Sequence, residues 1–138
     1  MRQGAVVLGA VVLLISWMGV SRTAADTSKL KSNESGKMLF KQNCASCHGD
    51  DAKGGGPAAV ALKVQPPDLT QLTRQKGGKF PYDEVKKTIA GESMVSAHGS
   101  REMPTWGPLF LAMTGENQKA VDQRLTNLTD YLKSIQAK

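Results

Sequence analysis

The feature that most constrains this chain is the segment Cys44-Ala45-Ser46-Cys47-His48, which contains its only two cysteines. A disulfide between these cysteines would close a very short loop and would hardly restrain the unfolded chain. The 138-residue chain is also poor in aromatic residues, at 5%, and it contains long stretches with glycine and proline. A small domain of this kind buries little side-chain area and usually needs another source of stability.

The spacing of this segment fits the attachment pattern of c-type haem. The thiols of Cys44 and Cys47 stand about one helical turn apart, so both can form thioethers with the vinyl groups on one porphyrin edge. The imidazole of His48 then lies beneath the iron, and the porphyrin supplies the apolar volume that the polypeptide lacks. We therefore predict one covalent haem c, with His48 as an axial ligand of the iron.

Two other interpretations of the same segment stay open from the sequence. A thioredoxin-like redox pair of Cys44 and Cys47 would require a βαβ context, which the helical pattern does not provide. A structural zinc site would need a fourth ligand beside the two cysteines and His48, and His98 is the only other histidine.

The second axial ligand has to come from a distant part of the chain, where the candidates are Met94, His98, Met103 and Met113. We prefer Met103 because Pro104 holds the adjacent backbone extended and rigid, which suits a loop that presents sulfur to iron. Met94 and Met113 are expected to be packing residues, and His98 would give bis-histidine ligation. Met103 as a flexible core filler is the alternative to its role as ligand.

Further residues are predicted to contact the haem or its ligands. The ring N–H of His48 should donate to a backbone carbonyl, which fixes the imidazole's orientation, and Pro57 is the expected acceptor. Trp106 and Arg101 are candidates to donate hydrogen bonds to a buried propionate. Alternatively, Trp106 packs against the haem edge and Arg101 is simply solvated.

The first helix is expected over Glu34–Asn43, with Ser32 or Asn33 as its cap and Cys44–His48 as its end. The preceding residues 26–33 are polar and are expected to be frayed. Gly36 lies one turn before Phe40 on the same face, so another helix could approach closely there.

The strongest helix is expected over Asn117–Gln136, because its apolar residues form a continuous stripe flanked by Tyr131. The stripe consists of Val121, Leu125, Leu128 and Leu132.

Shorter elements are expected between these two helices. Asp68 can cap a brief helix through Leu72, and a firmer helix is predicted over Pro81–Ala90, with Gly91 closing it. Residues 49–57 and 92–110 contain glycine and proline and are expected to be irregular. The pattern predicts an all-α fold whose long loops wrap around a large apolar ligand.

Residues 1–25 have the features of a signal peptide, and residues 26–138 form the expected domain. Arg2 supplies a basic start, an apolar run follows over Ala5–Val20, and Thr23-Ala24-Ala25 offers a cleavage point. The run is about sixteen residues long, shorter than the roughly 20 of a spanning helix, although an uncleaved membrane anchor is the alternative. Both interpretations place the domain outside the cytoplasm, in the periplasm or an equivalent compartment.

The formal net charge of +6 comes from scattered residues, with small clusters at Lys86-Lys87 and at Arg74, Lys76 and Lys79. A nucleic-acid binder would show a basic stripe with interleaved aromatic residues, so we expect no nucleic acid partner. The charge favours redox-partner proteins with acidic docking surfaces, or it belongs to an ordinarily solvated surface. A membrane contact is expected only if the N-terminal segment is retained.

On these residues the chain resembles the class I cytochrome c family, of the bacterial mono-haem type. The segments that carry the resemblance are Cys44–His48, Gly54–Pro57, Pro66–Thr70 and His98–Phe110, together with the Gly36 helix and the terminal helix. The resemblance implies a small cytochrome c fold with three to five helices, crossing N- and C-terminal helices, and histidine and methionine on opposite faces of the iron. The loop lengths differ from those of mitochondrial cytochromes c, so the resemblance does not identify this chain's redox partners.

With both axial positions filled, iron cannot readily bind a substrate, so we expect a one-electron carrier rather than an enzyme. The alternative is a cytochrome subunit of a periplasmic oxidoreductase complex. A five-coordinate haem sensor or peroxidase is a further possibility that a spectrum would distinguish.

Overall fold

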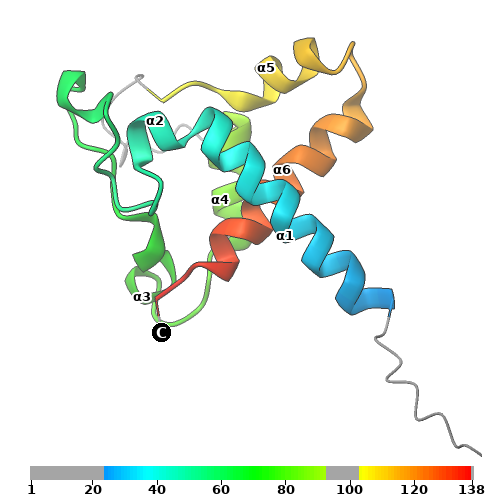
Figure 1. Ribbon diagram of the computed structural model, residues 1–138, viewed down its shortest axis with the longest axis horizontal. Helices are drawn as coiled ribbons and strands as arrows, with labels where there is room; N and C mark the ends of the chain where they lie inside the picture. The colour runs from blue at the N-terminus through cyan, green and yellow to red at the C-terminus, as the bar shows by residue number, and fades with distance from the viewer. Residues whose placement is uncertain (1–23, 93–102, 138) are drawn as a thin grey trace, which may run out of the picture.

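The computed structural model describes residues 24–92 and 103–137, in which every regular element is a helix. Figure 1 shows the first long helix, α1, lying across the last one, α6, with the shorter elements gathered around this crossing. The long helices are α1 (Ala24–Asn43), α4 (Tyr82–Ala90), α5 (Trp106–Met113) and α6 (Gln118–Ser134). The short ones are α2 (Ala45–His48), η1 (Ala59–Ala61), η2 (Leu69–Gln71) and α3 (Leu72–Gln75). The predicted all-α class is confirmed for these residues.

Helix α1 is longer than the sequence pattern predicted. It begins at Ala24, so Ser32 and Asn33 lie within the helix and the prediction that one of them caps it was wrong. Residues 26–33, expected to be frayed, are helical for the same reason. Lys29, Leu30 and Lys31 in this stretch have good helix propensities. Within the described part of the chain, no helix is long and apolar enough to cross a membrane.

The crossing of α1 and α6 depends on a residue without a side chain. A Cβ atom at Gly36 would overlap the backbone carbonyl of Asn127 and would come within 2.7 Å of the Cβ of Tyr131. One turn further along α1, the ring of Phe40 is buried, with its centroid 5.5 Å from that of Tyr131. The close approach predicted at Gly36 is confirmed.

Helix α6 forms the centre of the core, as its apolar stripe predicted. All four stripe residues are buried, with 6% exposure or less: Val121, Leu125, Leu128 and Leu132. The helix begins directly after Asn117, whose Oδ1 accepts a hydrogen bond from the backbone N–H of Ala120 at 3.1 Å. This cap satisfies one of the N–H groups that a helix start leaves without an internal partner.

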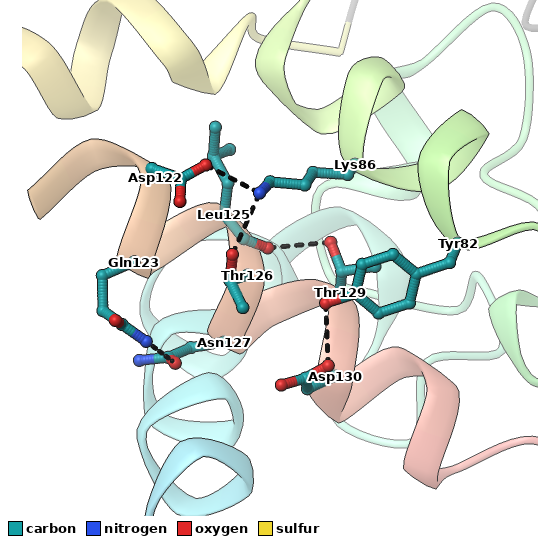
Figure 2. Close-up of polar contacts among 9 residues, drawn as sticks. All are labelled: Tyr82, Lys86, Asp122, Gln123, Leu125, Thr126, Asn127, Thr129 and Asp130. Atoms are coloured by element: carbon teal, nitrogen blue, oxygen red, sulfur yellow. Dashed lines mark hydrogen bonds and ion pairs between the residues drawn. The ribbon is translucent and has the colours of Figure 1, made fainter. Parts of the chain in front are cut away.

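Helix α4 contacts α6 through polar side chains, which Figure 2 shows. The hydroxyl of Tyr82 donates to Oδ1 of Asp130 at 2.8 Å. The Nζ of Lys86 lies 2.7 Å from Oδ1 of Asp122 and donates to Oγ1 of Thr126 at 3.0 Å. Because partners of Tyr82 lie nearer the end of α6 than partners of Lys86, the two helices run antiparallel at this contact.

The ends of α4 are close to the prediction. Gly91 closes the helix with a φ of 83°, a left-handed conformation that glycine adopts at no steric cost. Pro81, expected in the first turn, instead precedes the helix as its N-cap residue.

Helix α5 lies where an irregular segment was expected, so the prediction for residues 106–110 was wrong. Gly107 and Pro108 suggested a break, but Pro108 falls in the first turn of the helix. Backbone N–H groups there have no partner within the helix, so proline removes no hydrogen bond. Met113, expected in the core, is 61% exposed at the end of α5.

Candidate functional site

The helices enclose a largely apolar cavity of about 410 Å³. Its walls come from the end of α1, from α2, α3, α4 and α6, and from the chain just before α5. Volumes of this size are typical of pockets for small organic ligands. The apolar lining residues include Phe40, Leu62, Val64, Leu69, Leu72, Val85, Ile89, Leu128 and Leu132.

One wall of the cavity is formed by Cys44, Cys47 and His48, as their spacing predicted. The backbone N–H of Cys44 bonds to the carbonyl of Phe40 at 2.8 Å, so the chain turns directly from α1 into the attachment segment. The N–H of His48 bonds to the carbonyl of Cys44 at 2.9 Å. This helical turn directs both thiols and the imidazole to one cavity, and Nδ1 of His48 is buried.

The glycine-rich loop after His48 folds back onto this turn. Its N–H groups bond to the free carbonyls of α2, from Gly54 to His48 at 2.8 Å and from Gly56 to Cys47 at 3.1 Å. A Cβ atom at Gly56 would lie 2.6 Å from the carbonyl oxygen of Ala45, so the loop can pack this tightly only with glycine there. Pro57 follows in the loop with an exposed side chain, and it stays the predicted acceptor for His48.

The thiol of Cys44 is held in its protonated form. Burial, and to a smaller extent the neighbouring Cys47, raise the pKa of Cys44 to about 12. Redox-active cysteines of the thioredoxin type have a lowered pKa and a βαβ context. The raised pKa, together with the entirely helical structure of the described residues, disfavours a thioredoxin-like pair.

Met103, Pro104 and Trp106 also line the cavity. Trp106 is the first residue of α5, and its ring packs against Phe110 with centroids 5.5 Å apart. The structure therefore brings Met103, the preferred second ligand, and His48 to the same cavity. Met113 is not among the residues that line it.

Three other predicted site residues, Met94, His98 and Arg101, lie outside the described residues. Among the residues that the structure describes, no group of three or more histidine, cysteine, aspartate or glutamate side chains is arranged to hold a metal ion.

Sequence reasoning missed the polar part of the cavity wall, which includes Gln75, Lys76, Glu84 and Thr88. Lys76 and Glu84 form an ion pair at 2.9 Å. No motif marks these positions, because they become neighbours only when the chain reverses between α3 and α4.

The residues of the cavity fit a haem c in their chemistry. A thiol pair on one wall suits two thioether bonds, an imidazole and a thioether sulfur suit iron, and the remaining walls are mainly apolar.

Comparison with known proteins gives the same picture. The sequence profile described as "Cytochrome c" matches residues 33–136. The chain is 39% identical over 72 residues to the cbb3-type cytochrome c oxidase subunit FixPc of Rhizobium leguminosarum bv. viciae, covering 46% of this chain and 24% of the relative.

Two further relatives match at similar levels. The cbb3-type cytochrome c oxidase subunit FixP of Sinorhizobium medicae is 33% identical over 75 residues, covering 54% of this chain and 21% of the relative. The menaquinol:cytochrome c reductase cytochrome c subunit of Bacillus subtilis is 35% identical over 60 residues, covering 41% and 24%.

The chain thus spans about a quarter or less of the length of these relatives. No solved structure matches it significantly. The family implies a covalently bound haem c and electron transfer through it. The profile match covers most of the chain and agrees with the all-helical fold, so the chain belongs to the cytochrome c family.

Proposed function

We propose that this chain is an exported one-electron carrier, with a single haem c bonded through Cys44 and Cys47 and bound at its iron by His48 and Met103. The observation that carries the proposal is the shared cavity. Cys44, Cys47, His48 and Met103 all line it, although Met103 lies far along the chain from the other three. When bound, the haem supplies an iron that changes between its ferric and ferrous states.

The residues of the chain hold that iron in an environment suited to electron transfer. His48 lies on a turn fixed by backbone hydrogen bonds on both sides, so its imidazole needs little reorganisation when the charge changes. A hydrogen bond from its ring N–H to the Pro57 carbonyl would keep the imidazole in one orientation. A neutral sulfur from Met103 would raise the reduction potential relative to a second histidine.

The apolar walls exclude water from the space around the iron. Leu128 and Leu132 on α6 face Val85 and Ile89 on α4, and all four are buried and line the cavity. Trp106, with Arg101 as a second candidate, would donate a hydrogen bond to a propionate at the more open side. With both axial positions occupied by the chain, no substrate reaches the iron.

Residues 1–25 act, in this proposal, as a signal that directs residues 26–138 to the periplasm or an equivalent compartment. The basic start, the apolar run and the small residues near Ala25 support this role. The redox partners would be proteins with acidic docking surfaces, since residues 26–138 contain 16 basic and 12 acidic residues.

A second candidate function is that of a cytochrome subunit within a periplasmic oxidoreductase complex. The observation that favours it is that the relatives above are subunits of an oxidase and of a reductase. Size-exclusion chromatography of the protein from its native host separates the two: a free carrier elutes at the size of one small domain, and a subunit elutes with its complex.

The ligation is tested by the visible spectrum of protein purified from a host that matures c-type cytochromes. We expect a low-spin spectrum, no rapid carbon monoxide binding after reduction, and the weak far-red absorption of a sulfur–ferric bond. Met103→Ala should remove that absorption and open the iron to carbon monoxide, whereas the control Met94→Ala should retain it. Loss in Met94→Ala alone would overturn the assignment of Met103. A high-spin wild-type spectrum would instead favour a sensor or peroxidase.

A further inference from the structure

The wall of the cavity carries one pair of full charges. Among the described residues that line it, Lys76 and Glu84 are the only members of the lysine, arginine, aspartate and glutamate group. The Nζ of Lys76 lies 2.9 Å from Oε1 and 2.9 Å from Oε2 of Glu84. The two charges on the wall therefore face each other directly.

The chain places this pair at the mouth of the cavity. Lys76 directly follows α3, and Glu84 lies in the first turn of α4. The reversal between them uses Gly77 and Gly78, whose φ values of 69° and 91° are left-handed. The side chains of Lys76 and Glu84 are 48% and 45% exposed, so each has one side in water and the other towards the apolar interior.

Stability does not explain a pair in this position. Ion pairs with both partners this exposed contribute little to folding. A charge at the edge of an apolar cavity nevertheless acts strongly on charge inside it, because the medium between them screens poorly. The pair is therefore placed to act on whatever fills the cavity.

We propose that Lys76 and Glu84 balance each other's opposite effects on the reduction potential of the haem in this cavity, so that removal of either charge alone shifts it, an inference that rests on the proposed function. One electron from a redox-partner protein reduces the ferric iron to ferrous, so the haem loses one unit of positive charge. The cation of Lys76 favours the reduced state and raises the potential. The carboxylate of Glu84 favours the oxidised state and lowers it, and in the pair the two effects largely cancel.

A second ion pair on the same helix provides a matched control. The Nζ of Lys86 on α4 lies 2.7 Å from Oδ1 of Asp122 on α6, as Figure 2 shows. Neither Lys86 nor Asp122 lines the cavity. Both pairs join a lysine to a carboxylate and have one member on α4, but only Lys76 and Glu84 line the cavity.

The test is the midpoint potential of the purified holoprotein, measured by spectroelectrochemistry at low ionic strength. We expect Lys76→Met to lower the potential and Glu84→Gln to raise it, with the double variant close to wild type. Lys76→Arg, which keeps the charge, should restore the potential. The control Lys86→Met should shift it much less, and about 1 M salt should reduce every shift.

Two results would overturn the inference: shifts of Lys76→Met and Glu84→Gln in the same direction, or shifts no larger than that of Lys86→Met. A variant that fails to fold is recognised by its loss of helical circular dichroism, and Lys76→Gln then replaces it in the comparison. If the wild-type protein carries no covalent haem, the proposed function fails instead. If the protein is red but the variants have the wild-type reduction potential, only the role of this ion pair is refuted.

Discussion

The contacts of helix α6 with α1 and with α4 differ in kind. Against α1 it packs backbone to backbone, with Gly36 over the carbonyl of Asn127 and with the ring of Phe40 on Tyr131. Against α4 it uses, besides apolar residues of the shared core, hydrogen bonds between polar side chains, of which the bond from Tyr82 to Asp130 is one. In the first contact, steric exclusion fixes the distance between the helices. In the second, the distance depends on the length of the side chains that form hydrogen bonds.

The difference matters because the cavity lies beside both contacts. Phe40 of α1 and Leu128 of α6 form one part of its wall, whereas Val85 and Ile89 of α4 form another. Excluded volume permits almost no adjustment, so the α1 side should be rigid. Long polar side chains can change rotamer at small cost, so the α4 side should tolerate substitution.

The largest effect is expected for a substitution in the α1 contact. Gly36→Ala should lower the free energy of unfolding by about 3 kcal/mol or more, because the new Cβ overlaps a backbone carbonyl that only a shift of the helix can relieve. Thermal unfolding of the purified protein measures this loss. Gly55→Ala is the matched control, since a Cβ there meets nothing within 4 Å. Equal melting temperatures of the two variants would contradict the distinction between the contacts.

A smaller effect is expected at the start of α4. Tyr82→Phe removes only the hydroxyl that donates to Asp130, so the free energy of unfolding should fall by about 1 kcal/mol. A double-mutant cycle with Asp130→Asn, followed by chemical denaturation, isolates that bond. No coupling between the two positions would show that the hydrogen bond does not hold α4.

The same tyrosine predicts a dependence on alkaline pH. Burial, followed by the hydrogen bond to Asp130 and its negative charge, raises the pKa of Tyr82 above its ordinary value of 10.0. The folded state then keeps the proton after the unfolded state has lost it, so stability should fall as pH rises above that value. Denaturation at about pH 9 and about pH 11 should show a smaller fall in Tyr82→Phe. Some fall should remain, because burial also raises the pKa of Tyr131.

The smallest effect is expected at Lys86. Lys86→Met removes an ion pair whose carboxylate partner, Asp122, is 64% exposed, so the loss should be at most about 1 kcal/mol. About 1 M salt should weaken the wild-type protein by a similar amount and the variant hardly at all. A loss comparable to that of Gly36→Ala would mean that the polar contact is as demanding as the steric one.

Several features that follow from local rules could be predicted from the sequence, although the expected cap at Ser32 or Asn33 was wrong. The stripe on α6, the cap at Asp68 and the closing Gly91 depend on neighbours within a few residues, and the structure confirms them. The close approach at Gly36 was also predictable, because a glycine on an apolar helix face leaves room for the backbone of a neighbouring helix.

The features that sequence reasoning missed depend on context. Pro108 suggested a break, yet its place in the first turn makes it compatible with α5. The exposure of Met113 depends on what lies beside it, which periodicity does not report. The pairing of Lys76 with Glu84 arises from the chain reversal between their helices.

The predictions for the site also separate into a local and a non-local part. The attachment segment is one local pattern, and the structure places Cys44, Cys47 and His48 on one cavity. The second ligand is a non-local choice among several residues, and Met103 remains a prediction.

The central claim is tested most directly by the mass of the denatured protein, purified from a host that matures c-type cytochromes. A denaturant removes any haem that is merely bound, so only thioether bonds retain it. We expect the mass of the polypeptide plus one haem, and the mass of the polypeptide alone for Cys44→Ser/Cys47→Ser. A folded, helical wild-type protein with the mass of the polypeptide alone would contradict the account.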